Sequence, residues 1–448
     1  MKAKRIAMFC ILILLLVGIG NLWAGGRSDS GTARRSAAIS FWHTYTGIDP
    51  VASQFQGSFA KFQRESPDIQ FEVEEIDSAN VSMATRIQTM LAANDLPDVF
   101  HYWGGITIRA MVDNGLLMDV QEYLNATVNF KFEEITQAAW DYYTLDGVIR
   151  GFPIQGFYPA WFVNKEYFER FNLDYPRTMQ DVIGLAPIFN GNGIIPLAMG
   201  SSGGNPGHFF FSDLLHQYAG GTDEIRNFGA TNKFATENHI KAAQMILDLR
   251  TAGVFPQDTV ANGDWTPSFE LYNSGLAAML YTNSWAFSNM SDAMFEKSVI
   301  IDTPLVDGAS VPSSGFVQSS ANYGFLVTER AWSDTNKQAA LVRFIDWFLS
   351  DELNQALSAA GNVSVKVGVL PTPDMKLMYS VENFYQGRER VPAHFHTTSL
   401  RGGLLRFASA CDELFAGAVS AMGFVNNIQS AYDEAYEEAA AARRLRLR

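Results

Sequence analysis

Cysteine is nearly absent from the sequence, which contains only Cys10 and Cys411 among its 448 residues. Cys10 lies in an apolar segment near the amino terminus that we expect to be removed, so Cys411 would remain alone. A single cysteine forms no intramolecular disulfide, and packing must therefore stabilise the folded chain. Cys411 falls in a helix-like stretch, where such a residue is usually a small buried hydrophobe rather than a nucleophile.

Basic residues are too few to balance the acidic ones. The chain has 33 Lys and Arg residues against 47 Asp and Glu residues, and its formal net charge is −14. This balance disfavours nucleic acid and anionic membranes as partners. The four arginines at the end of the sequence complement the dipole of a terminal helix, and they do not require a nucleic acid.

Long apolar runs are missing except at the amino terminus. Three basic residues precede an apolar run over residues 6–20, and Ala24 supplies a small residue where a signal peptidase would cut. This pattern predicts a cleavable secretory signal peptide over residues 1–24. The alternative is a retained membrane anchor, although the run is shorter than the ~20 residues that a spanning helix needs.

The segment after the predicted cleavage site is rich in Gly, Ser and Arg. We expect residues 25–36 to form a flexible leader before the folded protein begins. Gly25 stands where a lipoprotein would carry its lipidated cysteine, so a lipid anchor is unsupported. The expected location is periplasmic or otherwise extracytoplasmic.

Strand-like and helix-like segments alternate from Ala37 onward. Residues 37–42 have the pattern of a buried strand, and the apolar residues of the segment 51–62 then recur at helical spacing. The same alternation restarts after a turn at Asp146-Gly147. Strands that alternate with helices predict an α/β fold with largely parallel sheets. The length favours two such lobes over one oversized domain.

Eight short motifs occur in a fixed order along the chain. They are ISFWH (39–43), FAKFQRESPDI (59–69), LAANDLPDV (91–99), DGVIRGFP (146–153), FVNKEYF (162–168), PRTMQ (176–180), GIIPLAMG (193–200) and YNSGLAAM (272–279) followed by SW (284–285). Each motif is weak alone, but their order makes chance implausible. The series resembles the extracellular solute-binding proteins of sugar-importing ABC transporters, the family that includes maltose-binding protein. Arg150, Leu276 and Asn283 depart from the residues usual in that family.

The resemblance implies a two-lobed periplasmic binding protein fold, in which each lobe is a mainly parallel sheet flanked by helices and a hinge joins the lobes. Residues 37–150 with 304–350 would form the first lobe, and residues 151–303 with 351–448 the second. A monomer of this kind binds a sugar or oligosaccharide in the cleft between its lobes and delivers it to a membrane permease. It performs no catalysis and uses no cofactor or metal.

A sugar site needs aromatic rings interleaved with polar groups in a cleft, and such clefts form between domains. In open α/β sheets, ligands bind beyond the carboxyl ends of the strands. The ligand-binding candidates chosen on this basis are Trp42, His43, Tyr45, Tyr102, Trp103, Tyr158, His208, Trp285, Asn322 and Tyr323. The resemblance also places a sugar-stacking aromatic at Trp285. Each of these residues could instead belong to an ordinary core.

Other residues in the sequence could indicate a different function. His394 and His396 resemble a metal pair, but no third ligand is in sight. Gly191-Asn192-Gly193 lacks the remaining glycines of a phosphate-binding loop. A carbohydrate-active enzyme would need a pair of catalytic carboxylates, and no such motif stands out. An exported sensor that presents its ligand to a membrane receptor remains an alternative.

Overall fold

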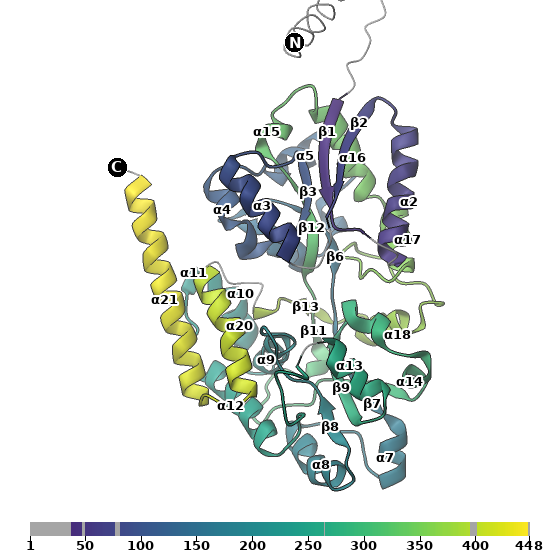
Figure 1. Ribbon diagram of the computed structural model, residues 1–448, viewed down its shortest axis with the longest axis vertical. Coiled ribbons are helices and arrows are strands. Elements are labelled where there is room, and N and C mark those ends of the chain that lie inside the picture. Colours follow the sequence, from purple (N-terminus) through teal and green to yellow (C-terminus); the bar gives the residue numbers. More distant parts are fainter. Residues whose placement is uncertain (1–36, 47–49, 77–80, 264, 395–400, 447–448) are drawn as a thin grey trace, which may run out of the picture. The chain divides into compact units, whose positions relative to one another are not determined.

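The computed structural model describes residues 37–46, 50–76, 81–263, 265–394 and 401–446. The predicted signal peptide and leader lie outside this part of the chain. Within it, no helix combines the length and the apolar character needed to cross a membrane. Its two larger sheets each lie among helices (Figure 1).

The first sheet has five strands in the order β2-β1-β3-β12-β6. Their bounds are β1 (Ala37–His43), β2 (Ile69–Glu75), β3 (Val99–Tyr102), β6 (Phe152–Gly156) and β12 (Ala321–Val327). The strand β1 runs parallel to β2 and β3, as the alternation of strands and helices predicted. The later strand β12 runs antiparallel to both β3 and β6. The sheet is therefore mixed, and β12 joins it from a distant part of the sequence.

Helices cover the first sheet and complete its core. They are α2 (Pro50–Glu65), α3 (Val81–Ala93), α4 (Arg109–Asp113), α5 (Val120–Ala126), α6 (Gln137–Tyr143), α15 (Glu329–Trp332), α16 (Gln338–Phe348) and α17 (Asp351–Ala359), with the 3-10 turns η1 (Gly105–Ile108) and η2 (Phe132–Glu134) and the hairpin β4 (Thr144–Leu145) and β5 (Val148–Ile149). Phe41 of β1 is fully buried at the centre of this core. Its ring lies 5.4 Å from Phe59 of α2 and 5.0 Å from Phe344 of α16.

The second sheet has four strands in the order β10-β7-β9-β8. Their bounds are β7 (Pro159–Asn164), β8 (Ile195–Ala198), β9 (Ala277–Asn283) and β10 (Ser298–Ile301). The strands β8 and β9 are parallel, whereas β7 is antiparallel to β9 and β10. The alternation of side chains along β7 separates two cores: Trp161 belongs to one, and Phe162 to the other on the opposite face.

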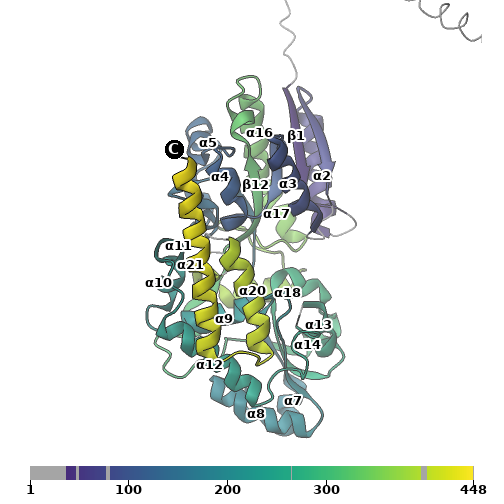
Figure 2. The same cartoon turned by 60° about the vertical axis from the view of Figure 1, so that its left-hand side comes forward.

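More helices surround the second sheet than the first. They are α7 (Lys165–Phe171), α8 (Met179–Gly191), α9 (Gly207–His216), α10 (Gly221–Arg226), α11 (Phe228–Thr231), α12 (Glu237–Thr251), α13 (Trp265–Asn273), α14 (Asp292–Glu296), α18 (Lys376–Tyr385), α20 (Arg401–Phe415) and α21 (Ala421–Arg446), with the 3-10 turns η3 (Ser284–Asn289) and η4 (Ser313–Gly315). The helices α20 and α21 pack side by side (Figure 2). Residues 416–420 form the short connection between these two helices.

One helix cap and one earlier prediction, the burial of Cys411, are clear in the structure. Asn164 caps α7, since its side-chain oxygen accepts a hydrogen bond from the backbone N–H of Glu166 at 3.1 Å. Cys411 is a buried free thiol in α20. Burial raises the pKa of this thiol well above its usual value, so Cys411 is a core residue rather than a reactive one.

The boundaries of the two sheets differ from the expected lobe ranges. The strand β6, which the expected boundary at residue 150 assigns to the second lobe, is an edge strand of the first sheet because it pairs with β12. The helix α17, which the boundary at residue 350 assigns to the second lobe, packs on α2 and contributes Leu353 and Leu357 to the first core. Conversely, Val306 and Val317, which were expected in the first lobe, pack in the cores of the second sheet.

Candidate ligand-binding site

Very short links hold one end of the strands of the first sheet, here called its edge, near one end of the strands of the second sheet. The strand β6 ends at Gly156, and β7 of the second sheet begins at Pro159, so two residues join them. A further two residues join β11 (Phe316–Gln318), which pairs with β13 (Glu389–Val391), to β12. The edge of the first sheet at these links is also the carboxyl end of β1 and β3, where open α/β sheets bind ligands.

Aromatic rings form a continuous series along this edge of the first sheet. Trp103 lies 4.8 Å from Tyr323, and Tyr323 lies 4.8 Å from His101, measured between ring centroids. His101 stacks on Tyr45 at 4.8 Å, and Tyr45 stacks on Phe55 at 4.1 Å. We call these five rings the ring ladder. Trp103 and Tyr323 at one end are half-buried, whereas the other three rings are buried.

Two histidines at this edge are uncharged at neutral pH. Burial lowers the pKa of His43 to about 4. Burial, aided by the nearby His43, lowers the pKa of His101 to about 3. The Nδ1 atom of His101 lies 2.6 Å from the hydroxyl of Thr44. Within the described residues, His43 Nδ1 and His101 Nε2 are buried without a hydrogen-bond partner. Neutral imidazoles suit an uncharged ligand better than an anionic one.

These shifted pKa values predict that the protein loses stability in acid. Below pH 6.5 the unfolded chain protonates His43, His101 and the similarly buried His216, whereas the folded protein does not until about pH 3–4. Stability should therefore fall as the pH drops from 7 to 4.5. Asp213 opposes this trend, because burial raises its pKa to about 6, whereas His239 and His394 add to it, because burial lowers their pKa values as well.

The measurement is the melting temperature of the ligand-free protein across this pH range, for the wild type and for His101→Gln. The variant should show a shallower decline, because it no longer differs from its unfolded state at that position. An equally steep decline in the variant would contradict the neutral, buried state of His101.

The remaining first-lobe candidates, Trp42, Tyr102 and Asn322, are not part of the ring ladder. Trp42 is buried and lies beneath the guanidinium of Arg86, whose Cζ is 5.0 Å from the ring centroid. Tyr102 is buried as well, and its carbonyl accepts a hydrogen bond from the hydroxyl of Tyr143 at 2.8 Å. Asn322 is half-buried and directly precedes Tyr323 in β12. The structure thus brings together only part of the predicted set.

The second-lobe candidates are dispersed. Tyr158 is the second residue of the link between β6 and β7 and is buried, with the guanidinium of Arg390 at 5.1 Å from its ring and Tyr385 of α18 at 5.9 Å. His208 in α9 is also buried; its ring lies 3.9 Å from that of Phe209, and its Nε2 is 3.1 Å from Asn205 Oδ1. The backbone of Trp285 lies in η3, directly after β9, and its side chain is outside the described part of the structure.

A cavity of about 540 Å³ begins at Gly105, two residues after Trp103 in the sequence. Its walls come from η1, α4, α6 and the β4–β5 turn on one side, from α10 and α11 on the other, and from the linking residues Ser320 and Pro392. Gly104, between Trp103 and this wall, is required there because a Cβ would lie 2.6 Å from the carbonyl oxygen of Tyr142. The volume is within the range of about 300–1,000 Å³ that is usual for small-molecule sites.

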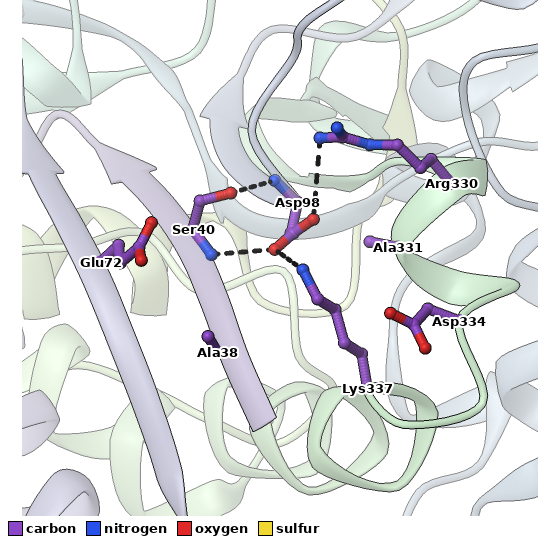
Figure 3. A pocket seen from close by; sticks show the side chains of 8 residues that line it. All are labelled: Ala38, Ser40, Glu72, Asp98, Arg330, Ala331, Asp334 and Lys337. Carbon is purple, nitrogen blue, oxygen red and sulfur yellow. Dashed lines mark hydrogen bonds and ion pairs between the residues drawn. The ribbon is translucent and has the colours of Figure 1, made fainter. Parts of the chain in front are cut away.

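A second cavity, of about 410 Å³, lies toward the opposite end of the first sheet's strands, near the amino-terminal residues of β1 (Figure 3). Its central group is the carboxylate of Asp98, which accepts hydrogen bonds from Ser40 N at 2.9 Å and Lys337 Nζ at 2.7 Å (Figure 3). Asp98 N in turn donates to Ser40 Oγ at 2.8 Å. These bonds tie α16 to β1 and β3, so we interpret the cavity as a structural ion-pair site.

Comparison with known proteins identifies the family. Residues 48–355 match the family model described as bacterial extracellular solute-binding protein. The chain belongs to this family. The resemblance seen in the eight sequence motifs is thereby confirmed. An ABC transporter extracellular-binding protein of Pyrococcus horikoshii, itself uncharacterized, is 27% identical over 240 residues, and the match spans about half of each protein, 52% of this chain and 53% of the relative.

Solved structures confirm the two-lobed α/β fold of this solute-binding protein. A chitin oligosaccharide binding protein superposes with a TM-score of 0.73 at 18% identity, covering 89% of this chain and 99% of that chain. A protein from xylan utilization by Caldanaerobius polysaccharolyticus has a TM-score of 0.71 at 19% identity, covering 88% and 99%. The maltose-bound MalE3 of T. maritima has a TM-score of 0.65 at 15% identity, covering 89% and 99%.

The histidine that suggested a metal in this solute-binding protein has a different neighbour. His394 Nε2 lies 2.9 Å from His239 Nε2, in a buried cluster beside Phe234. His396 is outside the described residues. No group of three or more His, Cys, Asp or Glu side chains able to hold a metal ion is found in the described part of the chain.

Two polar residues beside the candidate site of this solute-binding protein, His101 and Asn283, were not among the residues selected from the sequence. His101 was overlooked because it lies inside β3 rather than after the strand. The only signal in the sequence that could have indicated a role is the set of aromatic residues on either side of it. Asn283 ends β9 opposite Pro159, at the edge of the second sheet that the links bring near the first. Its carboxamide is fully buried, and neither its nitrogen nor its oxygen has a hydrogen-bond partner among the described residues.

Proposed function

We propose that this protein is the extracytoplasmic subunit of an ABC importer, which binds a sugar or oligosaccharide between its two lobes and delivers it to a membrane permease. The observation that carries the proposal is the ring ladder, with Trp103 and Tyr323 half-buried at the edge of the first sheet that is linked to the second. Sugar rings offer apolar C–H faces for such aromatic rings. Their hydroxyls suit neutral polar groups such as the imidazoles of His43 and His101.

The relatives support a carbohydrate ligand. The proteins of similar fold include one named for chitin oligosaccharide and one bound to maltose. The family is a family of binding proteins, and this favours capture without chemistry. The carboxylates on the cavity wall are also already bonded: Asp141 accepts from Gln137 at 2.8 Å, and Asp146 accepts from Arg109 at 3.0 Å. A glycosidase would need two carboxyl groups that flank the scissile bond.

The test is a panel of monosaccharides, disaccharides, oligosaccharides, amino acids and polyols, read out by melting temperature and by product analysis. A ligand that binds only the native state raises its stability by mass action. A raised melting temperature with unchanged sugar supports the proposal. Hydrolysis products would favour an enzyme, and a shift produced only by amino acids would exclude the sugar assignment. Co-purification with a permease rather than a receptor would distinguish an importer subunit from a sensor.

Salt dependence gives a further prediction for the same site. Stacking and hydrogen bonds to hydroxyls are screened little by ions, whereas ionic contacts at an exposed site weaken as the Debye length shrinks. The dissociation constant of the best sugar should therefore change by less than about twofold between low and moderate salt. It can be measured by calorimetry at two or three salt concentrations. A steep loss of affinity with salt would indicate an ionic ligand instead.

A further inference from the structure

We infer that Trp265 is a ligand-contacting residue of the second lobe, where its indole provides an aromatic wall for a sugar ring. The inference rests on the proposed function and extends it, because the ring ladder supplies a wall from the first sheet only. Three independent observations carry it: the position of the residue in the topology, its contacts with the links, and its exposure.

The topology places Trp265 at the edge of the second sheet that is linked to the first. Trp265 is the first residue of α13, and this helix packs on β8 and β9. Only three residues separate its last turn from the start of β9, so α13 runs back along the strand and begins near the strand's carboxyl end. That end is Asn283, which pairs with Pro159 next to the first link. Trp265 also packs against the cores on both faces of the sheet, as expected for a residue at its edge.

Trp265 is connected to both links through its contact with Phe209. Its ring lies 6.2 Å from that of Phe209 in α9. Phe209 in turn lies 5.2 Å from Phe157, which is in the link between β6 and β7. The carbonyl of Phe209 accepts a hydrogen bond from Gln318 Nε2 at 2.7 Å, and Gln318 is the last residue before the other link. Phe209 alone therefore lies between Trp265 and Phe157 of the first link, and between Trp265 and Gln318 beside the second link.

The exposure of Trp265 differs from that of the rest of its helix face. Phe269 and Tyr272 follow it at helical spacing and are fully buried against the second sheet, whereas Trp265 remains half-buried. Tryptophan is the residue that gains most from burial, and it is enriched at binding surfaces because it offers a large rigid face. Trp265 is thus a half-buried indole on the second sheet's side of the links, as Trp103 and Tyr323 are half-buried rings on the first sheet's side, and such a set is suited to hold a sugar.

The experiment measures the affinity of Trp265→Ala, Trp265→Phe and the wild type for maltose, xylobiose and diacetylchitobiose by calorimetry, together with each ligand-free melting temperature. Removing a stacked aromatic costs about 1–3 kcal/mol in comparable contacts, which corresponds to a loss of roughly ten- to a hundredfold in affinity. We expect this loss for Trp265→Ala and a smaller one for Trp265→Phe, which keeps a ring.

Trp347→Ala is the matched control, because Trp347 is also half-buried but stacks on Phe62 at 4.9 Å on the outer helix α16. This control should lower the melting temperature and leave the affinity unchanged. If the wild type binds a disaccharide and Trp265→Ala binds it equally well, the inference is wrong while the proposed function stands. If the wild type binds none of the panel of sugars, both fall together.

Discussion

Replacing Trp285 by alanine is expected to lower the affinity for the sugar ten- to a hundredfold and to leave the ligand-free protein as stable as before. Trp285 is the second residue of η3, immediately after β9 ends at Asn283 beside the link between the sheets. An indole at that point would present a flat apolar face to a sugar ring. The loss of one stacked aromatic costs about 1–3 kcal/mol, and about 1.4 kcal/mol is a factor of ten in affinity.

Two measurements decide this prediction. The dissociation constant of the best sugar from the panel reports the contact, and the ligand-free melting temperature reports packing. If Trp285 were instead part of a core, its truncation should cost about 3–5 kcal/mol of stability. A lowered melting temperature with intact affinity would therefore show that Trp285 is a packing residue. Combining Trp285→Ala with Trp265→Ala would then show whether the two indoles act on the ligand independently.

Replacing Phe41 by alanine is expected to destabilise the protein by about 3–5 kcal/mol, the usual cost of truncating a buried Phe. Phe41 is fully buried in the strand β1. Its ring contacts residues from three other elements, Phe59 of α2, Phe325 of β12 and Phe344 of α16, at 5.4, 5.5 and 5.0 Å. Because these elements come from both ends of the first lobe's sequence, the cavity would loosen the junction between them.

Denaturant unfolding measures this change, with Phe41→Leu expected to lose less because it leaves a smaller cavity. Val128→Ala is a suitable control, since the side chain of Val128 is 93% exposed and should contribute almost nothing. A loss below about 1 kcal/mol for Phe41→Ala, similar to an average surface change, would contradict the central position of this ring in the core.

Local sequence patterns predicted the first elements of the first lobe well and the completion of its sheet poorly. The strand β1, the helix α2 and the strand β2 follow from apolar spacing within a few tens of residues. The pairing of β12 with β3 and β6 joins residues about 170–220 positions apart along the chain, and it depends on which edges remain open after the earlier strands have paired. Periodicity carries no information about that choice, so β6 was assigned to the wrong sheet.

The same limit applies to the site. Trp42 and His43 were proposed together because they are adjacent at the end of a strand, but successive side chains of a strand point to opposite faces. His43 accordingly contacts Phe55 in the first core, at 5.3 Å, whereas Trp42 lies beneath Arg86. The strand period alone could have separated this pair. The neighbourhood of His101 and Tyr323 could not have been foreseen, because it depends on the long-range pairing of β12 with β3.

If the protein binds a sugar as proposed, the short links would let both halves of the site act on one ligand at the same time. Three Cα-to-Cα steps separate Gly156 from Pro159, so these strand ends can never be more than about 11 Å apart. A ligand held at one edge of the proposed site would therefore be presented to the other at a high effective concentration, which for short tethers is in the millimolar range. Each edge could then bind weakly by itself, because the covalent chain would contribute to the total affinity.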